Sequence, residues 1–140
     1  MMRKIGKAYN YFFFAVYRLM ETAPSRWWSE AKAALIISSL EIYLFAALCF
    51  YIESISYVPL FTTITAIVSG IIICAFNSYL FLYNNRWQST IEMFVDMPRN
   101  RKILYDGICV LVTLLILSSL IFALYQMSIV DWESIRNAPH

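Results

Sequence analysis

The segment from Ile103 to Met127 constrains this chain most, because its 25 residues include a single charged one, Asp106, near the start. As an α-helix it would be about 37 Å long, which exceeds the roughly 30 Å hydrocarbon core of a bilayer. A helix of this length that is apolar on every side has no place in a small water-soluble domain. The segment therefore predicts a membrane span.

Two earlier segments have the same character. One apolar run covers residues 33–52 and is interrupted by Glu41, and another covers residues 58–83, with Pro59 expected in its first helical turn. The composition agrees, since 61% of the residues are hydrophobic and 14% are charged, against about 25% charged in soluble proteins. We therefore expect an all-α integral membrane protein whose region 25–127 is a bundle of three transmembrane helices, at 33–52, 58–83 and 103–127.

The flanking segments are amphipathic or polar. Residues 1–24 begin with basic residues and continue with an apolar stripe at helical spacing, which predicts an amphipathic helix lying in the membrane interface. The stripe consists of Tyr9, Phe12, Phe13, Val16, Tyr17 and Met20. Arg18 breaks the apolar run and no small-x-small cleavage site follows, which argues against a signal peptide. A short interfacial helix is expected at about 86–97 and a polar tail at 128–140.

The Lys and Arg residues predict the orientation. Six precede the first span, none lie between the first two spans, four lie between the second and third, and one follows the third. Because these residues stay on the cytoplasmic side of a bacterial-type inner membrane, the N-terminus is expected inside and the C-terminus outside. A fourth, partial crossing by residues 9–20 is an alternative, although 12 residues cover only about 18 Å. Contacts with anionic lipid headgroups are expected for Arg3, Lys4, Lys7, Arg99, Arg101 and Lys102.

Four polar residues fall within the inner-leaflet half of the predicted spans: Glu41, Asn77, Ser38 and Asp106. Glu41 and Asn77 lie at the closest depth, so we expect Glu41 to point into the bundle and hydrogen-bond to Asn77, with Ser38 one turn away on the same face. Such a cluster serves either as polar glue between helices or as a proton- or cation-sensing site. Asp106 also suits a headgroup-level charge at a helix N-terminus, near Arg101 and Lys102.

A stripe of small residues recurs every four positions in the second predicted span and favours close helix packing. It consists of Thr62, Ala66, Gly70, Cys74 and Ser78. The partner helix could belong to the same chain or to another one.

No catalytic or cofactor motif accompanies these features. The three cysteines lie in separate spans and suit packing rather than a metal site, and the one histidine is His140. A net charge of +2 gives no reason to expect nucleic-acid binding. We therefore expect no enzyme activity, no cofactor and no metal, and a role as a small anchoring, scaffolding or regulatory subunit of a membrane complex.

Two alternative functions remain open from the sequence. One is a homo-oligomeric pore or membrane-disrupting effector, in which several copies surround a polar stripe that includes Thr62, Thr65, Ser69 and Asn77. The other is a small transporter that depends on Glu41. The expected partners are the lipid bilayer and either further copies of this chain or another membrane protein.

Overall fold

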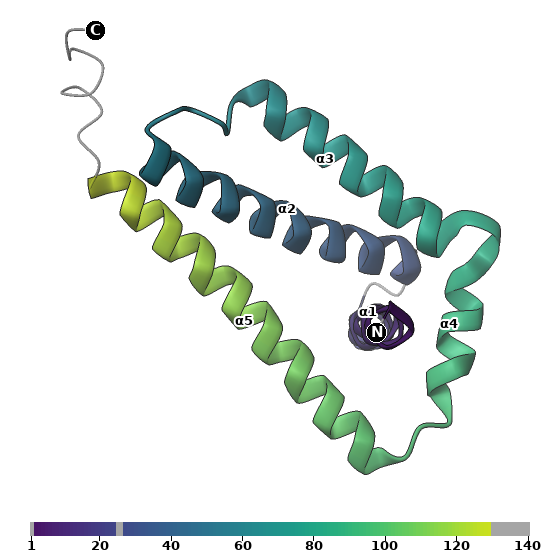
Figure 1. Cartoon of the computed structure of the whole chain (residues 1–140). Coiled ribbons are helices and arrows are strands. Elements are labelled where there is room, and N and C mark those ends of the chain that lie inside the picture. Colours follow the sequence, from purple (N-terminus) through teal and green to yellow (C-terminus); the bar gives the residue numbers. More distant parts are fainter. Residues whose placement is uncertain (1, 25–26, 130–140) are drawn as a thin grey trace, which may run out of the picture.

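The computed structural model describes residues 2–24 and 27–129, and every regular element within these ranges is helical (Figure 1). Side chains are described from residue 6 onward. The expected headgroup contacts of Arg3 and Lys4, and the tail beyond Ile129, therefore lie outside the described residues.

Five α-helices make up the described chain. They are α1 (Met2–Thr22), α2 (Ser29–Ser56), α3 (Thr63–Asn77), α4 (Arg86–Val95) and α5 (Arg99–Ile129). A π-helical turn, Ser78–Leu82, and a 3-10 turn, Tyr83–Asn85, join α3 to α4. Asn84 and Asn85 have φ values of 56° and 54°, in the left-handed region that asparagine tolerates better than most residues, so the chain changes direction there.

Three helices are long and apolar enough to cross a membrane, and they coincide with the three apolar runs of the sequence. Over their most apolar windows the mean hydropathy is 2.1 in Ser29–Ser56, 1.9 in Thr63–Val95 and 2.7 in Arg99–Ile129. Helix α1 is not among these candidates within the described ranges.

The second apolar helix begins later than expected. Residues 58–83 were predicted to be helical from Val58, with Pro59 in the first turn, but α3 starts at Thr63. Thr62 and Thr65 form a capping box, in which the Thr62 N–H donates to Oγ1 of Thr65 at 2.8 Å. This box fixes the helix start, and Pro59 lies in the non-helical connection that precedes it.

Helix α2 lies at the centre of the arrangement (Figure 1). It packs against α3 on one side and α5 on the other, and its first half contacts α1. Figure 1 shows α1 end-on near the start of α2, so α1 runs across the other long helices. Helices α4 and α5 also contact α1, which is therefore enclosed by three other helices.

Helix α1 is buried on two faces, whereas the sequence predicted one apolar stripe. On the first face Phe13 is fully buried among Ala33, Ala34, Ile37 and Phe81, and its ring stacks on Phe81 with centroids 4.1 Å apart. The two alanines leave room for the phenylalanine ring to approach α2.

The second face of α1 carries Tyr11 and Phe14, which pack with Phe94 of α4. These two aromatic residues lie outside the predicted stripe. They are buried because α1 sits between α2 on one side and α4 and α5 on the other, so a single apolar face would not suffice.

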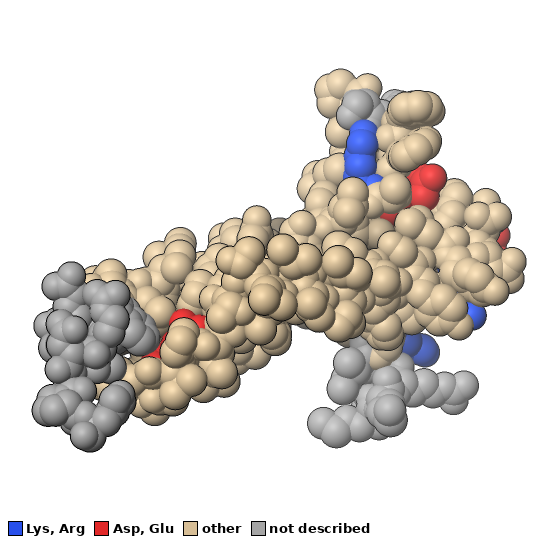
Figure 2. All heavy atoms as spheres, turned by 90° about the horizontal axis from the view of Figure 1, so that it is seen from above, with Lys and Arg blue, Asp and Glu red and all other residues tan. Residues whose placement is uncertain are grey.

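Charged side chains gather at one end of the molecule. In Figure 2 most of the coloured residues surround the place where α1 crosses, while the long remaining body is almost entirely uncharged. In the most apolar 18-residue stretches of Thr63–Val95, which begins with α3, and of α5, only 11% and 6% respectively is buried. Their surfaces are therefore composed of exposed hydrocarbon, which suits lipid or a partner helix as surroundings.

Candidate functional site

The predicted hydrogen bond between Glu41 and Asn77 is present and forms the centre of a three-residue group that we term the Glu41 cluster. Asn77 donates from Nδ2 to Oε2 of Glu41 at 2.7 Å. Tyr9 of α1 donates its hydroxyl to Oε1 of Glu41 at 2.6 Å and also contacts Oδ1 of Asn77. The cluster therefore joins α1, α2 and α3 through side chains that are 32 to 68 residues apart in the sequence.

Tyr9 is the member of this cluster that the sequence did not reveal as a partner. It was assigned to the apolar stripe of the first segment, and its ring does stack on Phe81 with centroids 5.5 Å apart. Burial and then the hydrogen bond to Glu41 raise the pKa of the Tyr9 hydroxyl above its usual value near 10. The hydroxyl therefore keeps its proton at neutral pH and donates it in the hydrogen bond to Oε1 of Glu41.

Asn77 is fully buried, and its amide also donates to the carbonyl of Ile73 at 3.2 Å. Ser38 is buried on α2, but its hydroxyl donates to the Ala34 carbonyl at 2.8 Å. Ser38 thus donates to the backbone of its own helix rather than to Glu41.

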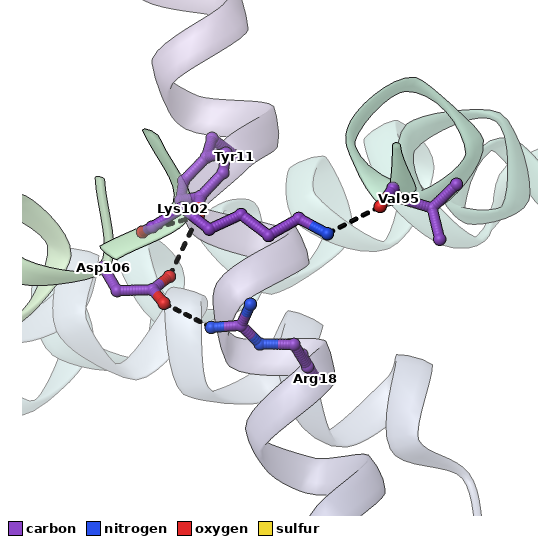
Figure 3. Close-up of polar contacts among 5 residues, drawn as sticks. All are labelled: Tyr11, Arg18, Val95, Lys102 and Asp106. Carbon is purple, nitrogen blue, oxygen red and sulfur yellow. Dashed lines mark hydrogen bonds and ion pairs between the residues drawn. The ribbon is translucent and has the colours of Figure 1, made fainter. Parts of the chain in front are cut away.

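Asp106 lies in a second group, which we term the Asp106 cluster and which includes Tyr11 and Arg18 of α1 (Figure 3). Tyr11 donates to Oδ1 of Asp106 at 2.9 Å, and Arg18 forms an ion pair with Oδ2. The Arg18 and Asp106 side chains are 42% and 32% exposed. The expected single polar group of four residues is therefore two clusters on different faces of α1.

The expected environment of Asp106 is also different. Helix α5 begins at Arg99, so Asp106 lies beyond its first turn and is not a helix-capping charge. Lys102 donates from Nζ to the Val95 carbonyl at 2.6 Å, which ties α5 back to the end of α4 (Figure 3). Arg18 supplies the positive partner because α1 crosses beside α5, a contact over 88 residues that sequence spacing does not indicate.

Glu53 is a third hydrogen-bonded carboxylate, and it lies between the predicted spans 33–52 and 58–83. Helix α2 continues to Ser56, and Glu53 is 4% exposed. Its Oε1 accepts the backbone N–H groups of Leu60 and Phe61, which precede α3. The carboxylate therefore supplies partners for backbone donors in the connection between α2 and α3.

The small-residue stripe on α3 is only partly turned toward α2. A side chain at Gly70 would meet Cδ1 of Ile42 at 3.8 Å, an ordinary contact distance. Ala66 and Cys74 are partly covered, whereas Thr62 and Ser78 at the two ends are exposed. The central part of the stripe thus faces α2, and its ends do not.

These two clusters consist of two carboxylates with two tyrosine hydroxyls, one amide and one guanidinium as their donors. Among the described residues, no group of three or more His, Cys, Asp or Glu side chains is arranged to hold a metal ion, and no buried side-chain nitrogen or oxygen lacks a hydrogen-bond partner. Comparisons with protein-family models, curated proteins and solved structures found no match. The polar side chains inside the bundle are thus suited to joining helices.

Proposed function

We propose that this chain is a non-enzymatic multi-pass membrane protein that acts as a small anchoring, scaffolding or regulatory subunit of a larger membrane complex. The observation that carries the proposal is the engagement of Glu41, Glu53 and Asp106, each of which is held by groups on another segment of the chain. Carboxylates held in this way stabilise an assembly of helices. The exposed apolar surfaces of α3 and α5 provide area for contacts with a partner.

We further propose that the protein resides in a cytoplasmic membrane with its N-terminus inside and its C-terminus outside. The distribution of Lys and Arg in the sequence, six, none, four and one, supports this orientation. The crossing direction of α1 and the clustering of charge around it support an interfacial position for α1 and α4 (Figures 1 and 2). Lys7, Arg99 and Arg101 are exposed at this end and suit contact with anionic headgroups.

A homo-oligomeric pore receives less support from the side chains that would line it. Asn77 is fully buried against Glu41, and Thr62 and Thr65 are used in the capping box of α3. Ser69 donates to the Ala66 carbonyl of its own helix at 3.1 Å. Each of these four side chains already makes a hydrogen bond within the chain, which supports the pore less than the subunit.

The existence of a partner is tested by excising membrane patches with an amphipathic polymer at native expression level. The mass of the particles that contain the full chain is then measured. A subunit gives a particle of fixed mass that contains this chain and a second protein in constant ratio. A ring of identical chains that conducts ions would support the pore instead. A monomer surrounded only by lipid would overturn both proposals.

Photo-crosslinking identifies the surface that meets the partner. A benzophenone amino acid is placed at Ile71 of α3 and, separately, at Leu115 of α5, which are 64% and 60% exposed. Leu35 of α2, 59% exposed, is the matched position on the central helix. A discrete protein adduct from α3 or α5, of the same mass increment as the native partner, is expected. Adducts with lipid alone at all three positions would contradict the subunit proposal.

The transporter alternative is tested by Glu41→Gln. Glutamine keeps the shape of the side chain and one acceptor oxygen, replaces the other oxygen with an amide nitrogen, and carries no ionisable proton. We expect the assembly and its partner to be unchanged. Proton-linked uptake of a substrate that the variant abolishes would favour transport instead.

A further inference from the structure

An apolar pocket of about 580 Å³ lies between α1, α2 and α5. Its volume falls within the range of 300–1,000 Å³ that is typical of small-molecule sites. Most of its lining is hydrocarbon, including that of Phe12, Val16, Leu40, Val110 and Leu114. Among the side chains that the structure describes, Arg18 and Asp106 are the charged ones that line it.

The two ends of this pocket differ in polarity. Along α5 its lining runs from Asp106 to Leu114, which are about 12 Å apart by helical rise. The charged end lies toward the start of α5, where Arg99, Arg101 and Lys102 follow one another in sequence. The other end is apolar. Such a gradient matches an amphiphile whose charged head lies by Arg18 and whose tail extends toward Leu114.

The charged end offers more donors than acceptors. Both oxygens of Asp106 are engaged, Oδ1 by Tyr11 and Oδ2 by Arg18. The guanidinium of Arg18 has five N–H donors, and its contact with Asp106 is made through one terminal nitrogen. Because the Arg18 side chain is 42% exposed, its remaining donors are accessible to an anionic group with several acceptor oxygens.

We propose that this pocket binds one acyl chain of an anionic phospholipid, with the phosphate against Arg18 and the chain between α1, α2 and α5. Hydrocarbon rather than water fills an apolar cavity that opens within a bilayer. The phosphate oxygens accept hydrogen bonds from the N–H groups of Arg18 that Asp106 leaves unused. This site is independent of whether the chain is a subunit, a pore or a transporter.

Lipid binding is measured by native mass spectrometry on the purified full chain in detergent. Phosphatidylglycerol is titrated against phosphatidylcholine with the same acyl chains, and the affinity for phosphatidylglycerol is expected to be about tenfold higher, because charge-assisted hydrogen bonds go to its uncompensated phosphate. Palmitate and glycerol 3-phosphate are separate arms. Equal affinity for the two phospholipids, or either fragment binding as tightly as phosphatidylglycerol, would overturn the proposal.

A pocket-filling variant tests the location of the chain. Thr113 lines the pocket, whereas Leu115 lies two residues further on α5, outside the lining and 60% exposed. Thr113→Trp is expected to weaken phosphatidylglycerol binding by about tenfold or more, since the indole occupies the space of the chain. Leu115→Trp adds a similar ring to the outer surface and should leave the affinity unchanged. Wild-type binding in both folded variants would overturn the proposal.

A second variant keeps the test decisive if Thr113→Trp does not fold. The double substitution Arg18→Gln and Asp106→Asn preserves the summed charge of the pair and removes the guanidinium donors. The preference for phosphatidylglycerol over phosphatidylcholine is expected to fall to about one in this variant, with phosphatidylcholine binding unchanged. A preserved tenfold preference would show that the phosphate does not lie against Arg18.

Discussion

The two faces of α1 are attached to the bundle in different ways. The face with Tyr9 and Phe13 meets α2 and the end of α3, where the donors that reach Glu41 are a neutral hydroxyl and a neutral amide. The face with Tyr11 and Phe14 meets α4 and α5, where Asp106 is paired with the charged Arg18. One carboxylate is thus held by neutral donors around a fully buried Asn77, and the other by a partly exposed ion pair.

This difference predicts how each attachment responds to mutation. A buried hydrogen-bonded group is costly to leave unsatisfied, whereas an exposed ion pair is weakened by solvent and contributes little. We therefore expect the Glu41 face to contribute most of the stability of the α1 attachment. The Asp106 face leaves its cation accessible to other ligands.

The largest effect is expected for Phe13→Ala. Phe13 is fully buried and stacks on Phe81, so its removal leaves a cavity and should lower the free energy of unfolding by about 4 kcal/mol. Denaturant titration in detergent micelles, followed by circular dichroism, measures this change. Leu19→Ala on the same helix is the control, since Leu19 is 63% exposed. Equal losses in the two variants would mean that α1 is not docked through Phe13.

Asn77→Leu should have the next largest effect. The substitution deprives Glu41 of its amide donor and Tyr9 of one contact, and we expect a loss of about 3 kcal/mol in the same titration. Ser78→Leu changes the adjacent, exposed residue to the same side chain and should alter stability by less than about 0.5 kcal/mol. A neutral result for Asn77→Leu would remove the distinction between the two faces.

Asp106→Asn should cost about 1 kcal/mol or less. The ion pair with Arg18 is partly exposed on both sides, so solvent screens it, and asparagine still accepts the Tyr11 hydrogen bond. Raising the salt concentration should weaken the wild type by a similar amount and leave the variant unaffected. A loss as large as that of Asn77→Leu would show that the pair is a main attachment of α1.

The smallest expected effect is a loss of stability of the wild-type protein at alkaline pH. The pKa values of Tyr9 and Tyr11 are raised by burial and by their carboxylate partners, above the value near 10 of the unfolded chain. Below pH 10 both states keep the phenolic protons and the full stability is present. Above pH 10 the unfolded state loses its protons first, so stability should fall as the pH rises.

This dependence is checked by thermal unfolding of the wild type and of the double variant Tyr9→Phe/Tyr11→Phe between about pH 8 and pH 11. The double variant should be less stable than the wild type at the lower end of this range and should lose less stability as the pH rises. An unchanged alkaline slope would mean that these hydroxyls are not shielded in the folded protein.

The sequence predicted the features that can be worked out from the position of a residue along a single helix. Three apolar runs gave three candidate spans, and the depths of Glu41 and Asn77 along their helices brought them together. Both inferences use only helical rise and hydrophobicity. They do not require the packing of distant segments to be known.

The contacts made by α1 could not be predicted in this way. Tyr9, Tyr11 and Arg18 reach their partners because α1 crosses the bundle, and its position is fixed by the fit of Phe13 beside small alanines. Glu53 was missed for a related reason, since its partners are backbone N–H groups that carry no sequence signal. Pattern analysis therefore found the long helices but not the way in which α1 packs across them.

The two hydrogen bonds that Glu53 accepts from the backbone just before α3 have a consequence for the insertion of the chain into the membrane. Leu60 and Phe61 lie only seven and eight residues beyond the carboxylate that receives their N–H groups. The connection between α2 and α3 is therefore held by local contacts, in addition to the bond between Glu41 and Asn77 further along the two helices. This α2–α3 hairpin can enter the lipid as a pair while the ribosome is still making α5, which then joins a preformed surface on α2.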